Sequence, residues 1–492
     1  MQYLMALDIG TSAVKAALFD VGGRLVALDS QEYQLEKPRP DILEIDPEAY
    51  WTAVQAAVAS IVAASAVAAE DVVSIGVTSQ GETLIVLDDA GRPLRKAIVW
   101  LDNRAVEEAR QIAAAFDADE VYRRTGQHEI VPGWTAAKIL WIRNHEAQLF
   151  KQVARFLMVE DYIIYRLTGE YVTDHAINPS TLYYDLTQSD WWDEMLAFLG
   201  ISRSQLPQLR FSGRDGAVLR ASIGLSSNTT VVSTPMDQIT GAVGAGNVQP
   251  GSITETTGSA LGICANASDP LYDPHKRVGL YRHALPGSYV VLPWVPTAGM
   301  ILRWFRDELG GGAGFEQLCA EAMNVPAGSD GLLVLPHFSG AVSPRVNPAA
   351  RGVIYGLSLG HTRAHIVRAV MESVAFMLKE NLDMLETLGL HAGRICSMGG
   401  GARNDLWLQI KANVLDRTVV TPEAQESTCL GAAVLAAVGA GIYGGLDEAV
   451  RAMVRMRREF APQPELVSCY ADTYQDYLQL NGMLLPTFGG KR

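Results

Sequence analysis

The chain has few cysteines, and no two of them stand in a C-x-x-C spacing. All five lie in the second half of the 492 residues. An odd, scattered set of this kind predicts reduced thiols that are mostly buried in a core, as in cytosolic proteins, and it argues against a disulfide framework.

Positive charge is also scarce, and no long cluster of lysine and arginine is present. The chain carries 40 basic and 54 acidic residues, which gives a formal net charge of −14 at pH 7. Because a surface of this sign repels polyanions, we expect no nucleic acid and no anionic membrane surface among its partners.

The chain lacks a long uninterrupted apolar run. Residues 53–69 are broken by Gln55 and serines, and residues 430–445 by glycines, which favours close helix packing over a membrane span. The first ten residues show no basic segment or cleavage site of a signal peptide. With 48% apolar residues over 492 positions, we expect a cytoplasmic protein with two large lobes and a cleft between them.

The first thirty residues contain a polar turn between apolar runs. Residues 3–8, 13–19 and 25–30 predict three antiparallel strands, with Gly22 and Gly23 in the second turn. A nucleotide loop of the G-x-G-x-x-G or G-K-[ST] kind requires a helix after it. A strand follows here instead, so we predict a strand-turn-strand cradle whose amides and small hydroxyls bind a phosphate.

A similar device recurs in the second half of the chain. Residues 251–265 predict another strand, small-residue turn and strand, with Gly258 and Ser259 at the turn. The recurrence indicates an internal duplication in an α/β protein. We expect two lobes, residues 1–244 and 245–492, joined by a short hinge.

A long helix and a glycine loop lie further along the second half. A helical stripe that includes Val370 and Val374 predicts a helix, and Gly389 is expected to end it. A strand, the loop Gly399–Ala402 and a helix from Asn404 follow.

Two longer segments resemble the signatures of the FGGY family of carbohydrate kinases. Residues 133–145, GWTAAKILWIRNH, resemble the first signature, with Lys138 and Trp141 at its set places, and residues 352–372 resemble the second. With the two cradles, the resemblance covers essentially the whole chain. It implies a duplicated α/β fold of two actin-like (ribonuclease-H-like) ATPase lobes, and ATP-dependent phosphorylation of a sugar or polyol hydroxyl.

The resemblance also implies the nucleotide site, with ATP and Mg²⁺ as cofactors. Asp8 would lie near the magnesium, through water, because a carboxylate beside phosphates requires a cation between them. The implied ATP-binding residues are Gly10, Thr11, Ser12, Lys15, Gly258, Ser259, Gly400, Gly401, Ala402 and Asn404. Taken alone, the cradles are compatible with ordinary turns, and Lys15 with a solvent-facing position.

Asp237 matches the catalytic aspartate of the family. It follows a predicted strand and precedes a predicted helix, where a carboxylate could accept the proton of the acceptor hydroxyl. The alternative is a helix N-cap, for which aspartate is among the favoured residues.

The acceptor pocket combines features of two branches of the family. The implied substrate-binding residues are Gln80, Gly81, Glu82, Trp134, Asp237 and Gln238. Gln80, Glu82 and Gln238 resemble glycerol kinases, whereas Gly81 replaces an arginine of that branch, and Gly133 replaces a tyrosine and agrees with xylulokinases. A pocket that lacks these two contacts should bind glycerol poorly and has room for a longer chain. We therefore expect a xylulokinase-like enzyme that acts on a ketopentose such as xylulose.

Several alternatives stay open at this point. One alternative is a kinase for glycerol, erythritol or another polyol or ketone, which uses the same chemistry. A more remote alternative is an actin-like ATPase that acts as a binding module. Trp100 could form an apolar wall, and Asp102 with Arg104 could serve the pocket or form an exposed ion pair. The phosphorylated carbon and the oligomeric state, for which a homodimer is one option, are not set by the sequence.

Overall fold

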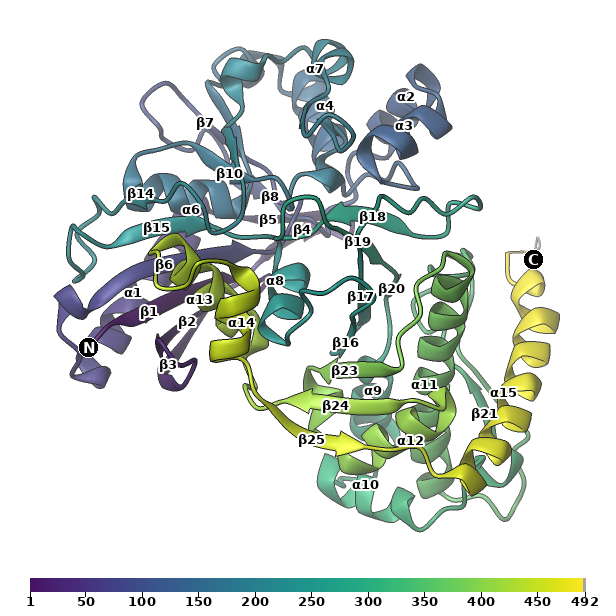
Figure 1. Ribbon diagram of the computed structural model, residues 1–492. Helices are drawn as coiled ribbons and strands as arrows, with labels where there is room; N and C mark the ends of the chain where they lie inside the picture. The colour runs from purple at the N-terminus through teal and green to yellow at the C-terminus, as the bar shows by residue number, and fades with distance from the viewer. Residues whose placement is uncertain (490–492) are drawn as a thin grey trace.

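The structure is a computed structural model that describes residues 1–489. It has two lobes, each built on a mixed β-sheet, with helices packed around them (Figure 1). The chain begins in the first lobe, and its C-terminal helix α15 (Pro464–Leu484) lies on the far side of the second lobe.

The first sheet begins with the predicted three-stranded meander. Its strands run in the order β14-β15-β6-β1-β2-β3. They are β1 (Tyr3–Ile9), β2 (Ala13–Asp20), β3 (Leu25–Glu32), β6 (Val72–Ser79), β14 (Ala217–Val218) and β15 (Thr230–Ser233). β1, β2 and β3 are antiparallel, whereas β6 runs parallel to β1 and β15 parallel to β6. β1 is central and mostly buried, which explains its apolar run.

The second sheet repeats this arrangement. Its path is β18-β19-β17-β16-β23-β24-β25, with β20 paired to β17. The strands are β16 (Ile253–Thr257), β17 (Leu261–Ala267), β18 (Gly279–Arg282), β19 (Tyr289–Leu292), β20 (Trp294–Val295), β23 (Arg394–Met398), β24 (Thr418–Pro422) and β25 (Met456–Phe460). The β16–β17 hairpin corresponds to β1–β2, and the parallel strands β23 and β24 correspond to β6 and β15. The predicted duplicated α/β fold is therefore confirmed.

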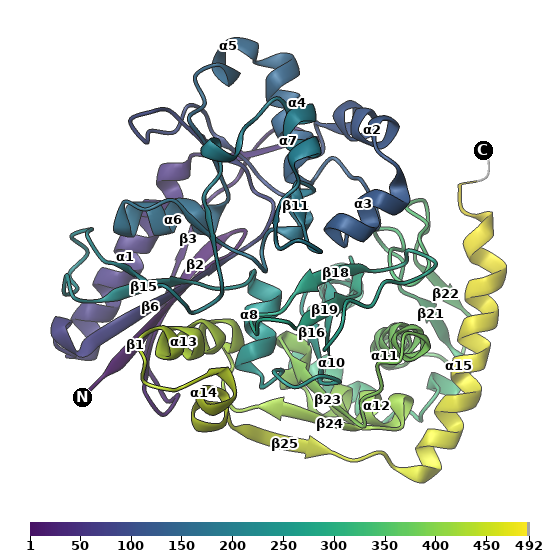
Figure 2. The same cartoon turned by 45° about the horizontal axis from the view of Figure 1, so that its top comes forward.

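Two helices lie side by side between the sheets (Figures 1 and 2). α8 (Asp237–Gly244) follows β15, and α13 (Ser427–Gly439) follows β24, so they are equivalent elements of the two halves. A Cβ on Gly431 of α13 would lie only 1.9 Å from the carbonyl oxygen of Thr240 in α8. Glycine permits this approach, which explains why residues 430–445 are rich in small residues.

α13 and the following helix, α14 (Leu446–Met453), pack on the first lobe although they come late in the chain. Leu4 and Ala6 of β1 share a buried cluster with Leu430 and Val434 of α13. The chain therefore passes between the lobes at α8 and again on either side of the α13–α14 pair. The division at residues 244 and 245 stays a prediction.

The segment between β6 and β14 forms a cap of short helices and strands beside the first sheet (top of Figure 1). Between β3 and β6 lie β4 (Glu36–Arg39), β5 (Ile42–Ile45) and α1 (Pro47–Ser65). The cap consists of β7 (Ile85–Leu87), β8 (Ala97–Ile98), α2 (Val106–Ala115), α3 (Ala118–Thr125), α4 (Thr135–His145), α5 (Ala147–Phe150), β9 (Arg155–Leu157), α6 (Val159–Thr168), β10 (Val172–Asp174), β11 (Tyr184–Asp185), β12 (Asp190–Trp191), α7 (Asp193–Leu199) and β13 (Gln208–Arg210).

The second lobe adds helices around its sheet. These helices are α9 (Gly299–Leu309), α10 (Phe315–Met323), α11 (Arg363–Thr387) and α12 (Asp405–Leu415). The strands β21 (Leu333–Leu335) and β22 (Val353–Tyr355) form a two-stranded ribbon beside them. α11 buries Val370 and Val374 of the predicted stripe, and Gly389 follows it with a φ of 84°. The local sequence signals for this helix are confirmed.

Candidate active site

The first predicted cradle is the turn of the β1–β2 hairpin. The amide of Gly10 donates to the carbonyl oxygen of Ala13 at 3.0 Å, and Tyr33 closes the outside of the turn by donating from its amide to Ser12 at 3.0 Å and from its hydroxyl to Gly10. Lys15 lies opposite Asp8 in the hairpin. Tyr33 thus holds the turn through its backbone and its side chain, and Thr11 lines the cleft.

Lys15 has a partner in the other half of the chain. Its Nζ lies 2.6 Å from the Oε2 of Glu426, which precedes α13. Glu426 was not among the predicted site residues. This ion pair joins the first cradle to the loop that leads into α13.

The second predicted cradle is the turn of the β16–β17 hairpin. The amide of Gly258 donates to the carbonyl oxygen of Ala260 at 3.0 Å, and Ser259 is exposed at the tip. Below the turn lies the fully buried Lys411, which pairs with Glu255 and donates to the Oγ1 of Thr257 at 2.9 Å. A buried ion pair with this additional hydrogen bond gives the turn a polar but satisfied base.

The glycine loop lies directly against the second cradle. A Cβ on Gly401 would come within 2.7 Å of the Thr257 side chain, and one on Gly399 within 2.9 Å of the Thr257 carbonyl oxygen. These glycines therefore bring the loop close to the predicted phosphate position. Asn404 acts as N-cap of α12, accepting a hydrogen bond of 2.9 Å from the amide of Trp407.

A cavity of about 300 Å³ opens beside this loop. Gly399 and Ala402 line it, together with the loop that follows β24. Three arginines that were not predicted also line it: Arg403, Arg457 and Arg458. Arg403 directly follows the glycine loop, so the sequence could have predicted it as a site residue. Arg457 and Arg458 come from β25 and lie near the loop only in the folded chain.

A second cavity, of about 390 Å³, lies between the lobes and contains every predicted acceptor residue. The predicted residues that line it are Gln80, Gly81, Glu82, Trp134, Asp237 and Gln238. Thr11 of the first cradle lines the same cavity, so the acceptor pocket and the phosphate cradle are adjacent.

Other residues of this pocket were missed by the sequence reasoning. They include Gln127, His128, Tyr281, Trp294 and Ser343. Gln127 and His128 form a polar pair just before the first signature, which is a weak signal. Tyr281 and Trp294 lie on strands of the second lobe, and no local pattern marks them as pocket residues.

Asp237 is the first residue of α8, where β15 ends. Burial raises its pKa to about 7, the charge of Asp8 adds to this effect, and a hydrogen bond of 2.6 Å from the Gln238 amide opposes it. Met236 occupies the N-cap position, so Asp237 is not the helix cap. A carboxylate with a pKa near neutrality can both take up and release a proton at pH 7.

Glu82 lies in a turn that a buried lysine supports. The Nζ of Lys138 on α4 donates to the carbonyl oxygen of Glu82 at 2.8 Å. Burial raises the pKa of Glu82, while Ser180 and Lys138 act the other way, and burial lowers the pKa of Lys138 to about 7. The first signature thus contributes the side chain that holds one wall of the acceptor pocket.

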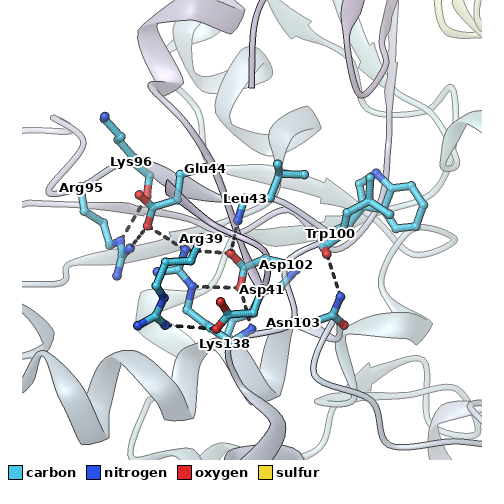
Figure 3. Close-up of polar contacts among 12 residues, drawn as sticks. Arg39, Asp41, Leu43, Glu44, Arg95, Lys96, Trp100, Asp102, Asn103 and Lys138 are labelled. Atoms are coloured by element: carbon cyan, nitrogen blue, oxygen red, sulfur yellow. Dashed lines mark hydrogen bonds and ion pairs between the residues drawn. The ribbon is translucent and has the colours of Figure 1, made fainter. Parts of the chain in front are cut away.

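The turn after β8 forms another wall, and Asp102 and Arg104 anchor it (Figure 3). Asp102 accepts from the Leu43 amide at 2.6 Å and from Arg104, which also lies 2.8 Å from Glu44. The Asp102 and Arg104 side chains are 0% and 3% exposed, so the alternative of an exposed ion pair is wrong. Neither residue lines the cavity, and the pair holds the turn against β5.

Trp141 of the first signature completes this support. The guanidinium of Arg104 lies 4.9 Å and that of Arg95 5.5 Å from the centre of its ring. Such stacking is stabilising in a desolvated setting. α4 therefore supports two pocket walls, through Lys138 and through Trp141.

Several polar atoms around the acceptor pocket have no hydrogen-bond partner among the described residues. They are Gln80 Oε1, Gln127 Nε2, both ring nitrogens of His128, Gln238 Oε1 and Ser343 Oγ. Buried polar atoms are rarely left without a partner unless a ligand or water supplies one. Their gathering at one cavity indicates that a polar ligand or bound water completes their hydrogen bonds there.

Comparison with known proteins decides the family. The model of the N-terminal domain of the FGGY family of carbohydrate kinases matches residues 3–244, and that of the C-terminal domain matches residues 253–440. The chain belongs to the FGGY family of carbohydrate kinases.

Relatives and solved structures of this FGGY kinase agree with this membership. The xylulose kinase of Bacillus subtilis (strain 168) is 31% identical over 482 residues, 97% of this chain and 96% of the relative. The glycerol kinase of Bordetella parapertussis (strain 12822 / ATCC BAA-587 / NCTC 13253) is 32% identical over 483 residues, covering 94% and 93%. The crystal structure of xylulose kinase from Rhodospirillum rubrum is 32% identical, with a TM-score of 0.89 and coverage of 99% and 100%.

The FGGY kinase is therefore a carbohydrate kinase with the actin-like fold of its family, whose members use ATP as the phosphate donor. In the described part of the chain, residues 1–489, none of the helices combines the length and apolar character needed to cross a membrane.

Asp8 of this FGGY kinase, which is predicted to lie near magnesium, is close to other charged groups. Burial raises its pKa to about 6, Glu426 adds to this, and Lys15 acts in the opposite direction. Asp8 and Asp237 interact, since the charge of Asp8 raises the pKa of Asp237, so a cation near both would relieve their repulsion. Within residues 1–489 no group of three or more His, Cys, Asp or Glu side chains is arranged to hold a metal.

Proposed function

We propose that this FGGY kinase transfers the γ-phosphoryl group of ATP to a hydroxyl of a ketopentose such as xylulose, with Asp237 as the general base. The carboxylate of Asp237 takes the hydroxyl proton, the oxygen forms a bond to the γ-phosphorus, and the bond to the β-phosphate oxygen breaks to release ADP. The observation that carries the proposal is the position of Asp237 in the acceptor pocket, which the cradle residue Thr11 also lines.

We infer that the two cradles hold the triphosphate, one from each lobe. In this proposal Gly10, Thr11, Ser12 and Lys15 contact it from the first lobe, Gly258 and Ser259 from the second, and Gly400, Gly401, Ala402 and Asn404 lie near the adenosine. Asp8 would hold Mg²⁺ through water, and the ion, when bound, neutralises phosphate charge.

The walls of the acceptor pocket favour a ketopentose over glycerol. Gly81 leaves space, since a Cβ there would have its nearest neighbours at 3.9 Å. At Gly133 a Cβ would lie 2.9 Å from the carbonyl oxygen of Trp100, so the present backbone does not admit the tyrosine expected of glycerol kinases. The pocket thus lacks both large glycerol contacts, and its unpaired polar atoms suit a longer chain of hydroxyls.

The second candidate is a kinase for glycerol, erythritol or another polyol or ketone. The 32% identity to a glycerol kinase and the residues Gln80, Glu82 and Gln238 support it. It requires the same base and the same nucleotide site.

A coupled ADP-release screen tests the proposal. The panel contains xylulose, ribulose, aldopentoses, glycerol, erythritol and gluconate, each at saturating MgATP, with measurement of kcat/KM. We expect the highest kcat/KM for a ketopentose. A higher value for glycerol or erythritol would favour the second candidate, and ADP release independent of every acceptor would reject sugar phosphorylation. Sedimentation of the same sample tests the open option of a homodimer.

A further inference from the structure

Three tryptophans line the acceptor pocket, Trp100, Trp134 and Trp294, and the indole N–H groups of the first two reach different parts of the protein. The Nε1 of Trp134 donates to the carbonyl oxygen of Glu129 at 2.8 Å, within the wall of the pocket itself. The Nε1 of Trp100 donates at 2.9 Å to the Oγ1 of Thr11, which is 89 residues away in the sequence and lies in the first phosphate cradle. Trp100 therefore connects the acceptor pocket to the cradle directly.

The backbone of Trp100 is held by its surroundings. Its amide donates to the Oγ1 of Thr83 at 3.1 Å, and its carbonyl oxygen packs against Gly133. The turn that carries it is anchored by Asp102, whose side chain points away from the ring (Figure 3). These contacts hold the backbone of Trp100 in place and leave its ring to be positioned from the pocket side.

The hydrogen bond from Trp100 decides how the Thr11 hydroxyl can act. A hydroxyl has one hydrogen to donate and two lone pairs to accept with. The indole N–H occupies one lone pair, and among residues 1–489 the structure provides no acceptor for the hydroxyl hydrogen itself. The hydroxyl is thus left as a donor toward the cleft, which is the role that a phosphate oxygen requires.

We propose that Trp100 is a positioning residue that couples acceptor binding to nucleotide binding. Its ring contacts the acceptor, and its N–H orients the Thr11 hydroxyl as a donor toward the nucleotide phosphates. The proposal rests on the proposed function, in which Thr11 contacts ATP. An acceptor that holds the ring in place strengthens nucleotide binding, and by linkage the nucleotide strengthens acceptor binding by the same factor.

Trp100→Phe tests the coupling, because it keeps an aromatic ring and removes the N–H. The matched control is Trp134→Phe, which removes an N–H of the same pocket that does not reach the cradle. We measure the KM for ATP, and the Kd of a non-hydrolysable ATP analogue by calorimetry with and without xylulose, or with the acceptor that the screen ranks first. Trp100→Phe should raise the KM for ATP about three- to tenfold and remove the effect of the acceptor on the analogue Kd. Trp134→Phe should change the KM for the acceptor and leave both nucleotide readouts within about twofold.

A double-mutant cycle with Thr11→Val identifies the hydrogen bond as the cause. In the Thr11→Val background, Trp100→Phe should change the KM for ATP by less than about twofold, since the bond is already gone. The coupling would be overturned if Trp100→Phe changed the KM for ATP equally in the unmodified and Thr11→Val backgrounds. It would also be overturned if Trp100→Phe and Trp134→Phe changed the KM for ATP and the analogue Kd equally. Neither result would affect the proposal of sugar phosphorylation. Failure of the proposed function is distinct, because the unmodified enzyme would then release no ADP in response to any acceptor.

Discussion

The Nζ of Lys138 donates a hydrogen bond of 2.8 Å to the carbonyl oxygen of Glu82, and both residues are buried. Glu82 has a φ of 57°, in the left-handed region that few residues other than glycine adopt. Lys138 therefore supports a strained turn in the acceptor pocket. Lys411, also fully buried, supports the second cradle through Thr257 in a similar way.

The two buried lysines should have separable kinetic roles. Lys138→Met releases the Glu82 turn, and we expect the KM for the acceptor to rise about tenfold or more while the KM for ATP changes little. Lys411→Met combined with Glu255→Gln keeps that site neutral and removes the donor to Thr257, so the KM for ATP should rise instead. Steady-state kinetics with each substrate varied in turn measures both. Parallel changes of the two KM values in both variants would contradict these roles.

Asp237→Asn should separate binding from turnover. The amide has the shape of the carboxylate but cannot accept the proton, so kcat should fall by about two or more powers of ten while the Kd of an ATP analogue stays close to that of the unmodified enzyme. Asp193→Asn, at the exposed first residue of α7, is the matched control and should keep its kcat. Near-normal turnover of Asp237→Asn would remove this residue from the mechanism.

The pH profile should report the same carboxylate. Burial raises the pKa of Asp237 to about 7 in the free enzyme, and the base is active only when ionised. We expect kcat/KM for the acceptor to fall about tenfold per pH unit below this value. Because the charge of Asp8 is one cause of the raised pKa, Asp8→Asn should move the acid limb to lower pH, whatever its effect on the maximal rate. An unmoved limb would show that another group titrates.

Stability should depend on the buried Asp174. Burial raises its pKa from 3.8 to about 7, despite hydrogen bonds from Ala176, Ser212 and Ser233. Between these two pH values the folded state binds more protons than the unfolded state, so this contribution to stability is lost as pH rises toward 7. Asp174→Asn should therefore make the free energy of unfolding, measured by denaturant titration, less dependent on pH across this window.

The control for this effect is Asp185→Asn. Despite burial, hydrogen bonds from Thr187 and Arg124 lower the pKa of Asp185, so its contribution has the opposite sign and is lost as pH falls. The same pH dependence for both variants would contradict the assignment to Asp174.

Substrate preference should respond to Gly81. The space around its Cβ position admits a side chain, so Gly81→Arg should fold normally, lower kcat/KM for a ketopentose about tenfold or more, and raise the value for glycerol relative to it. Gly133→Ala serves for comparison, because its Cβ must displace the Trp100 carbonyl and should weaken both acceptors. The ADP-release assay with both acceptors measures the ratio. An unchanged ratio in Gly81→Arg would show that this position does not select the acceptor.

Most of the fold could be predicted because its signals are local. The β1–β2 and β16–β17 hairpins follow from apolar runs separated by small polar turns, and their recurrence predicted the duplication. The small residues of α13 indicated close packing without indicating the partner. That α13 packs on the first lobe depends on the passage of the chain between the lobes, which no local pattern encodes.

Some residues of the acceptor pocket could likewise be predicted from the sequence, and others could not. Gln80, Glu82 and Asp237 follow strands β6 and β15 or lie close to their ends, and sequence reasoning placed them together. His128, Tyr281 and Ser343 come from distant segments, and they were missed because each has an ordinary local sequence.

By itself the sequence determined where the chain turns, which runs are buried and which family it belongs to, because these properties depend on residues that are close together along the chain. Only the tertiary structure decided that Trp100 reaches Thr11, that Lys138 supports Glu82, and that Asp102 with Arg104 forms a buried anchor. The physical reason is that such contacts join residues from separate elements, and their distances are set by how the two sheets and the crossing helices pack.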